Sequence, residues 1–133
     1  MTTSAVGKFD GGARPPDKGP AAIGYTVEMG GSTEEKGHDR IGRATCNEAE
    51  YHALIQGLEA ASKKGCTEVE ARGDSQLIVR QVTGEWQTKE PRLRELRDRV
   101  REVADEFEQF EIRHTPREEN READTLVEQA FAD

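Results

Sequence analysis

The sequence predicts an α/β fold in which one mixed five-stranded sheet is flanked by helices. Three short segments with strand character precede the first helix, and closely spaced strands of this kind form an antiparallel meander. The strand-then-helix order that follows requires crossover connections, which add parallel strands to the meander. With 133 residues, the chain is expected to be a single domain over 1–133.

The meander is expected over residues 5–10, 22–29 and 32 to about 41. Residues 22–29 contain β-branched and aromatic side chains, and Gly30-Gly31 provides the turn into the third strand. The Pro- and Gly-rich segment 11–20 is expected to be a loop between strands rather than a linker between domains.

The first helix is expected over residues 46–64. Thr45 and Glu48 have the spacing of a capping box, in which each side chain accepts a hydrogen bond from the other's backbone N–H. Glu50 lies on the same helical face as Leu54 and the apolar residues that follow, so it should point inward. A carboxylate in that position is costly unless something compensates its charge.

The remaining elements are a strand over 68–74, a helix over 75–82, a helix that begins after Pro91, a strand over 107–114 and a final helix. Asn120 can cap this final helix. Its buried face is expected to contain Ala123, Val127, Ala130 and Phe131.

The net charge of −8 argues against a general attraction to phosphate, so any affinity for nucleic acid must be local. The cations are six lysines and 13 arginines. An acidic, lysine-poor surface suits a protein that works in concentrated salt, where self-repulsion is screened. Genomic bias toward arginine codons explains the same composition.

No segment approaches the roughly 20 apolar residues of a membrane helix, and the N-terminus lacks the pattern of a signal peptide. We therefore expect a soluble, cytoplasmic protein with no membrane partner. Cys46 and Cys66 belong to no CxxC pair or His cluster, which favours free thiols over a disulfide or a zinc site.

Four acidic residues lie at the predicted element boundaries: Asp10, Glu50, Asp74 and Asp124. Taken singly, Asp74 has the alternative role of capping the short helix, and Asp124 that of offsetting the positive end of the last helix. Glu50 has no Lys or Arg one turn away to pair with. If the four converge, they require cations, and oxygen ligands favour Mg²⁺ or Mn²⁺ over zinc.

Five segments, in this order and at these intervals, resemble type 1 ribonuclease H over nearly the whole chain. They are Phe9-Asp-Gly-Gly12, 19–25 (GPAAIGY), 45–50 (TCNEAE), 73–76 (GDSQ) and 114–124 (HTPREENREAD). The resemblance implies a ribonuclease H-like fold and a metal-dependent endonuclease that cleaves the RNA strand of RNA–DNA hybrids to 5′-phosphate and 3′-hydroxyl products. It makes the four acids the ligands of two Mg²⁺ or Mn²⁺ ions, and it implies a monomer with no separate hybrid-binding domain.

The resemblance also assigns substrate contacts. Asn47 and Gln76 would hold the strands in the minor groove, and Gly11 and Gly12 would let the backbone approach the RNA. Asn47 is alternatively an ordinary residue of the first helical turn. Many relatives have Asn where this chain has Cys46, and the first loop is longer than usual, so contacts from both places are in question.

His114 stands ten residues before Asp124, which is the interval of the family's proton-shuttling histidine. We expect it to act as general acid or in product release. Two alternatives are that His114 only ends a strand, and that Arg117 approaches the leaving group in its place.

The helix after Pro91 alternates arginines with acidic residues, which is typical of a solvated face with ion pairs; a phosphate-tracking surface is the alternative. Residues 86–89, which precede it, could meet the DNA strand. Two further functions stay open: a broader nuclease that also cuts double-stranded RNA, and a non-catalytic hybrid-binding module. The complete acidic set argues against the second.

Overall fold

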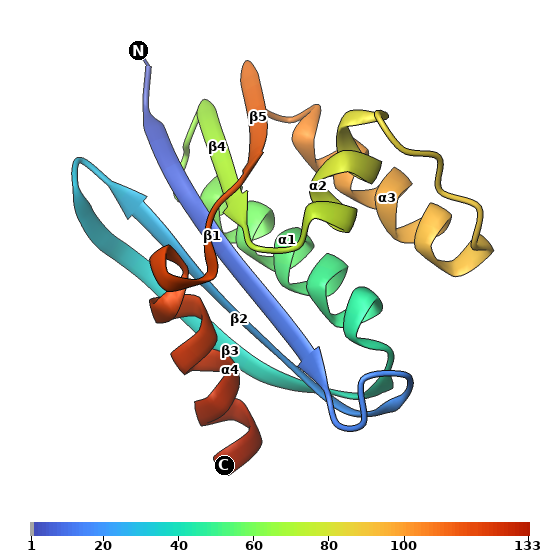
Figure 1. The fold of residues 1–133 in the computed structure, drawn as a ribbon. Helices are drawn as coiled ribbons and strands as arrows, with labels where there is room; N and C mark the ends of the chain where they lie inside the picture. Colours follow the sequence, from blue (N-terminus) through green and yellow to red (C-terminus); the bar gives the residue numbers. More distant parts are fainter. Residues whose placement is uncertain (1) are drawn as a thin grey trace.

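The computed structural model describes residues 2–133 and confirms the α/β class (Figure 1). Within this range the strands are β1 (Ser4–Ala13), β2 (Gly19–Met29), β3 (Ser32–Ala44), β4 (Glu68–Gly73) and β5 (Gln109–His114). The helices are α1 (Cys46–Lys63), α2 (Gln76–Thr83), α3 (Pro91–Ala104), the short 3-10 helix η1 (Arg117–Glu119) and α4 (Arg121–Ala132). The helix bounds agree with the sequence within one or two residues.

The sheet has the strand order β3-β2-β1-β4-β5. β1 pairs with β2, and β2 with β3, in antiparallel fashion, so the predicted meander is confirmed. β4 lies parallel to β1, and β5 lies parallel to β4, as the crossover connections require. β1 is therefore the central strand and has neighbours on both sides.

Several strand boundaries differ from the prediction, and β3 continues to Ala44 rather than to about residue 41. β1 and β2 extend into the segment expected to be a loop, and only residues 14–18 connect them. β5 begins at Gln109 rather than Phe107, because the Phe107 N–H donates to the Ala104 carbonyl at 3.1 Å and so belongs to the turn after α3. The Phe107 ring is buried in the core.

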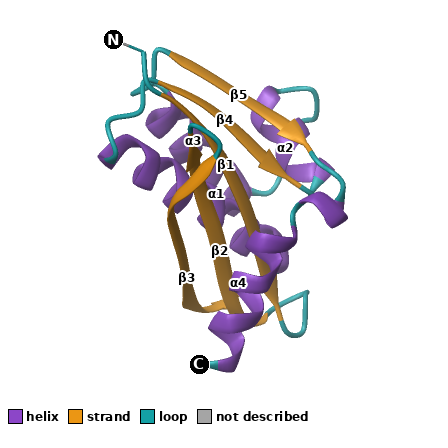
Figure 2. Ribbon diagram, turned by 90° about the vertical axis from the view of Figure 1, so that its left-hand side faces the viewer, coloured by secondary structure: helices purple, strands orange, loops and turns teal. Residues whose placement is uncertain are grey.

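The helices cover the two faces of the sheet unequally. α1 packs on one face with α3 against it, whereas α4 lies on the other face over β1, β2 and β3 (Figure 2). The larger core lies under α1 and includes Phe9, Tyr51, Leu54 and Leu58. Within the described range, no helix is long and apolar enough to cross a bilayer.

Polar groups fix the ends of the two helices that pack on the central strands. At the start of α1 the Glu48 N–H donates to Thr45 Oγ1 at 3.1 Å, and the Thr45 N–H donates to Glu48 Oε1 at 3.0 Å, which confirms the capping box. At the end of α4 the Arg40 guanidinium, which comes from β3, donates to the carbonyls of Ala130 and Phe131. Arg40 thus satisfies carbonyls that a helix end leaves without partners.

Candidate active site

A local opening in the sheet defines the candidate site. β4 ends at Gly73, which pairs with Phe9, whereas β1 continues to Ala13. The Gly11 N–H lies beyond this last pair and donates to Glu50 Oε1 at 2.8 Å instead of to a strand. The Glu50 carboxylate, which comes from α1, can therefore reach the edge of β1 that β4 leaves unpaired.

The four acidic residues meet at this opening. Ligand oxygens of Asp10, Glu50 and Asp74 all lie within 4.8 Å of one another. Asp124, in the first turn of α4, lines the same cavity of about 280 Å³ as these three residues. The structure thus brings together side chains from β1, α1, the end of β4 and α4.

Asp74 and Asp124 also bear on the alternatives that the sequence left open. The N-cap of α2 is Ser75, whose hydroxyl accepts from the Ile78 N–H at 3.4 Å, so Asp74 does not cap this helix. Asp124 does lie in the first turn of α4, where a negative charge offsets the positive helix end. That role is compatible with its place in the cavity.

Burial and mutual repulsion raise the pKa of two of these acids. Burial, followed by the charges of Asp74 and Asp124, raises the pKa of Asp10 to about 7. Burial, followed by the charges of Asp10 and Asp74, raises the pKa of Glu50 well above its ordinary value, although the Gly11 N–H opposes the rise. Cations in the cavity would reverse both effects, and a set made only of oxygens fits Mg²⁺ or Mn²⁺.

Asn120 belongs to this site, although the sequence suggested only a helix cap. It occupies the N-cap position of α4, but its side chain makes no capping hydrogen bond. Its amide Nδ2 donates instead to the Phe9 carbonyl at 3.0 Å and to Asp74 Oδ2 at 3.3 Å. No local sequence pattern distinguishes these two roles, because both place Asn before a helix.

Basic side chains line the rim of the cavity. Arg14 forms an ion pair with Glu128 and lies 4.1 Å from the centroid of the Phe131 ring. Arg117, from η1, is another lining residue. His114 is exposed at the end of β5, next to Gly73, and is not among the residues that line the cavity.

The residues expected to contact substrate are divided between two places. Gly11 and Gly12 line the cavity. Asn47 lies half-buried in the first turn of α1, and Gln76 is exposed at the start of α2; neither lines the cavity. Cys46 is free, as is Cys66, in agreement with the expectation of unpaired thiols.

The arginines of α3 are engaged within the protein. Arg92, Arg97 and Arg99 form ion pairs with acidic residues. Arg94 donates to the Thr88 and Lys89 carbonyls at 3.2 and 3.0 Å, and Arg101 donates to the Val82 carbonyl. These contacts favour the ion-paired face over a phosphate-tracking surface. Trp86, in the connection before α3, is exposed, with the Arg80 guanidinium 5.2 Å from its ring centroid.

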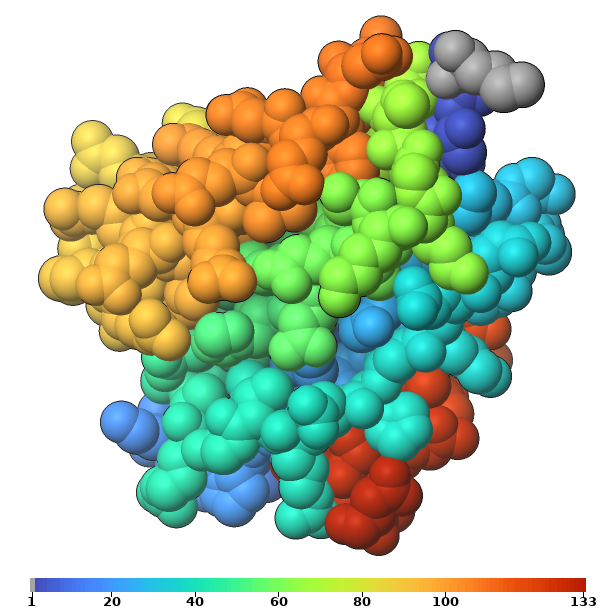
Figure 3. Space-filling view, turned by 180° about the vertical axis from the view of Figure 1, so that it is seen from behind, coloured from blue at the N-terminus to red at the C-terminus, as the bar shows by residue number. Residues whose placement is uncertain are grey.

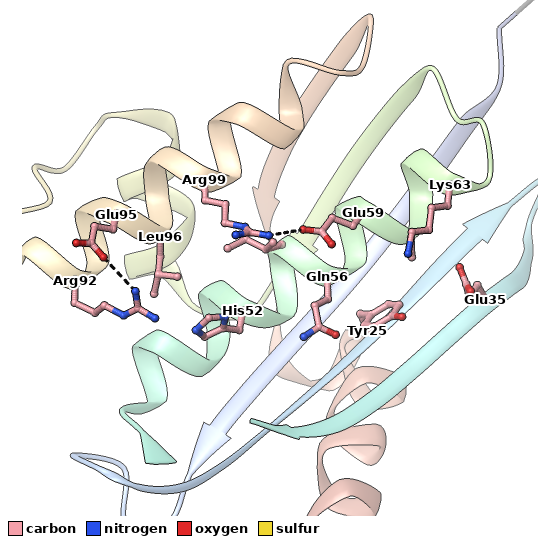
Figure 4. A pocket seen from close by; sticks show the side chains of 12 residues that line it. Tyr25, Glu35, His52, Gln56, Glu59, Lys63, Arg92, Glu95, Leu96 and Arg99 are labelled. Atoms are coloured by element: carbon pink, nitrogen blue, oxygen red, sulfur yellow. Dashed lines mark hydrogen bonds and ion pairs between the residues drawn. The ribbon is translucent and has the colours of Figure 1, made fainter. Parts of the chain in front are cut away.

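A larger hollow lies on the back of the molecule, where α1 is flanked by α3 and β3 (Figure 3). It measures about 570 Å³, and Figure 4 shows two ion pairs among the residues that line it. Arg99 bonds Glu59 at 3.2 Å, and Arg92 bonds Glu95 at 3.2 Å. Its three acids, Glu35, Glu59 and Glu95, are matched in number by Lys63, Arg92 and Arg99, so this hollow lacks the excess of acids of the smaller cavity.

Comparisons with known proteins agree with this site. Residues 9–130 match the model of the family described as reverse transcriptase-like. The chain is 48% identical over 126 residues to the curated ribonuclease HI of Halobacterium salinarum, a match that covers 94% of the chain and 63% of that relative's length.

Solved structures are similar over almost the full length. The crystal structure of RNase H1 from Halobacterium salinarum has a TM-score of 0.95 and 46% identity, with 98% of each chain covered. LC11-RNase H1, solved in complex with an RNA/DNA hybrid, has a TM-score of 0.90 and 39% identity, with 96% of each chain covered. These matches confirm the five-stranded fold expected from the resemblance. The chain belongs to the reverse transcriptase-like family and, with these relatives, to the type 1 ribonucleases H.

Proposed function

We propose that residues 1–133 form a catalytic domain that hydrolyses the RNA strand of RNA–DNA hybrids and leaves 5′-phosphate and 3′-hydroxyl ends. The observation that carries this proposal is the convergence of Asp10, Glu50, Asp74 and Asp124 around one cavity. The ribonuclease HI relative supports the activity, and the hybrid complex of LC11-RNase H1 supports the substrate.

We propose that these four carboxylates hold two divalent ions, Mg²⁺ or Mn²⁺. Four negative charges balance two divalent cations, so the scissile phosphate can enter without meeting excess negative charge. When bound, such ions supply an activated water and stabilise the charge on the departing 3′ oxygen. The chain contributes the placement of the ligands: the Gly11 N–H holds the Glu50 carboxylate next to Asp10.

Arg117 and His114 are the two residues proposed to assist departure of the 3′ oxygen, by stabilising its charge or by giving it a proton. Arg117 has the support of lining the cavity, where its guanidinium would stabilise negative charge. His114 lies outside the cavity lining and would have to approach for proton transfer. Substituting Arg117 and His114 by alanine one at a time and comparing kcat distinguishes them, because only the group that acts in the reaction should lower it strongly.

The remaining parts of the proposal concern binding and context. Gly11, Gly12, Asn47 and Gln76 are proposed to contact the hybrid in its minor groove. We also propose that the protein acts as a monomer in the cytoplasm, and its free thiols fit a reducing compartment.

The decisive experiment compares labelled RNA–DNA, RNA–RNA and DNA–DNA duplexes in Mg²⁺, Mn²⁺ or EDTA. We expect cleavage of the RNA in the hybrid, only with metal, and 5′-phosphate ends that phosphatase removes. Asp10→Asn should abolish cleavage, whereas Asp39→Asn, which changes an exposed carboxylate on β3, should not.

The same assay decides between the alternatives. Cleavage of RNA–RNA at a similar rate would indicate the broader nuclease, and metal-independent cleavage would contradict the proposed mechanism. Tight hybrid binding without cleavage in either metal would indicate the non-catalytic binding module.

A further inference from the structure

Asn120 is a fully buried polar residue that joins three of the acid-bearing segments. Its side chain is 0% exposed. The amide Nδ2 donates to the carbonyl of Phe9, the residue before Asp10, and directly to the Asp74 carboxylate. The backbone carbonyl of Asn120 accepts a hydrogen bond from the Asp124 N–H at 3.1 Å, in the first turn of α4.

The chemistry of the neighbours fixes the direction of this amide. Both partners of Nδ2 are acceptors, so a flipped amide would place Oδ1 against two oxygens. In the observed orientation Oδ1 is buried and has no hydrogen-bond partner within residues 2–133. An unpaired buried oxygen is unfavourable, and an apolar residue of similar size would avoid it. The donor at this position therefore has a role beyond filling space.

We infer that Asn120 is a positioning residue, which sets the Asp74 carboxylate relative to Asp10 and Asp124 so that the cavity can bind divalent ions. This inference rests on the proposed function in assigning ions to the cavity. Asn120 would act on the ions through Asp74, to which it donates a hydrogen bond. In other metal sites, loss of a residue that hydrogen-bonds a ligand weakens metal binding roughly 10- to 100-fold.

Three variants of the full chain test the role of Asn120. Asn120→Leu removes the donor and the unpaired oxygen at nearly constant volume. Asn120→Asp keeps the shape but replaces the N–H donors with a carboxyl group that would repel Asp74, so it decides the question if the leucine variant does not fold. Thr26→Val is the matched control, because Thr26 is also 0% exposed and its Oγ1 has no partner among the described residues, but it bonds none of the acids.

The primary readout is Mn²⁺ binding by calorimetry in the absence of substrate. Both Asn120 variants should bind Mn²⁺ at least about tenfold more weakly than the unaltered chain, and Thr26→Val should bind it within about twofold. In hybrid cleavage at fixed Mn²⁺, the Asn120 variants should lose kcat with little change in KM, and additional Mn²⁺ should restore part of the rate.

Wild-type Mn²⁺ affinity and kcat in a folded Asn120 variant would overturn the inference. Equal weakening in Thr26→Val would overturn it too, because the effect would then follow from general loss of packing. If the unaltered chain binds Mn²⁺ but leaves hybrids intact, the proposed function is wrong, and the calorimetric comparison still decides the role of Asn120. Absence of Mn²⁺ binding in the unaltered chain would overturn both.

Discussion

The Gly11 N–H donates a 2.8 Å hydrogen bond to the carboxylate of Glu50, which joins the central strand to the second turn of α1. The two segments approach so closely that a Cβ on residue 11 would lie 2.4 Å from the carbonyl carbon and oxygen of Ala49. These are backbone atoms of α1, which cannot rotate out of the way of a new Cβ as the end of a flexible side chain can. The close approach thus explains a glycine here without reference to substrate.

Gly11→Ala should both destabilise the protein and reduce hybrid cleavage, because α1 and Glu50 must move away from Asp10. The expected loss is about 1–3 kcal/mol, as for other overpacked sites. Gly12→Ala is the matched control for stability, since its Cβ would meet only side-chain carbons at 4.0 Å. Denaturant titration measures both variants, and equal stability of the two would contradict this account of Gly11.

Asp10→Asn should stabilise the metal-free protein, and the gain should depend on pH. A carboxyl group whose pKa is raised on folding binds protons as the chain folds, so its contribution to stability falls as the pH rises from about 4 to about 7. With the pKa of Asp10 raised from 3.8 to about 7, the gain should be on the order of 4 kcal/mol at pH 7.5 and small near pH 4.

Unfolding in EDTA at both pH values measures this gain. Asp39→Asn serves as the control, because that carboxylate is exposed on β3 and away from the cavity. A gain of the same size at pH 4 and pH 7.5 would contradict electrostatic repulsion as its cause.

Arg40→Ala should destabilise the attachment of α4. The guanidinium donates to Ala130 O at 2.9 Å and also to Phe131 O, so its loss removes partners from the last carbonyls of the helix. We expect a loss of about 1 kcal/mol, with faster hydrogen exchange in α4 than in α1. Lys36→Ala, an exposed change on the same strand, should leave both measurements unaltered.

The acidic surface predicts a response to salt. If the charge of −8 is an adaptation to concentrated salt, the melting temperature should rise between 0.1 M and 2 M KCl as self-repulsion is screened. Calorimetric scans at the two concentrations measure it. An unchanged or lower melting temperature would favour codon bias as the origin of the arginine-rich composition.

Local patterns made much of the fold predictable from the sequence. The capping box of Thr45 and Glu48 depends on residues three apart, and the inward direction of Glu50 follows from helical periodicity alone. The strand-helix order then fixes β4 beside the meander. The convergence of the four acids came from the resemblance and from their positions at element ends, not from any contact visible in the sequence.

What the sequence did not reveal depends on long-range geometry. Arg40 reaches a carbonyl 90 positions away, and Asn120 reaches Phe9 across 111 positions. No repeating pattern of residue types in the sequence predicts either contact. The opening that admits Glu50 depends on β4 ending four residues before β1 in the paired register, and strand ends are the least predictable boundaries.

The amide of Asn120 and the carboxylate of Asp124 both come from the last segment of the chain, whereas Asp10 lies near its beginning. A folding chain cannot complete the acidic pocket until α4 docks on the sheet beside β1 and β2. Undocking of α4 alone would therefore dismantle the acidic pocket while the central sheet stays folded.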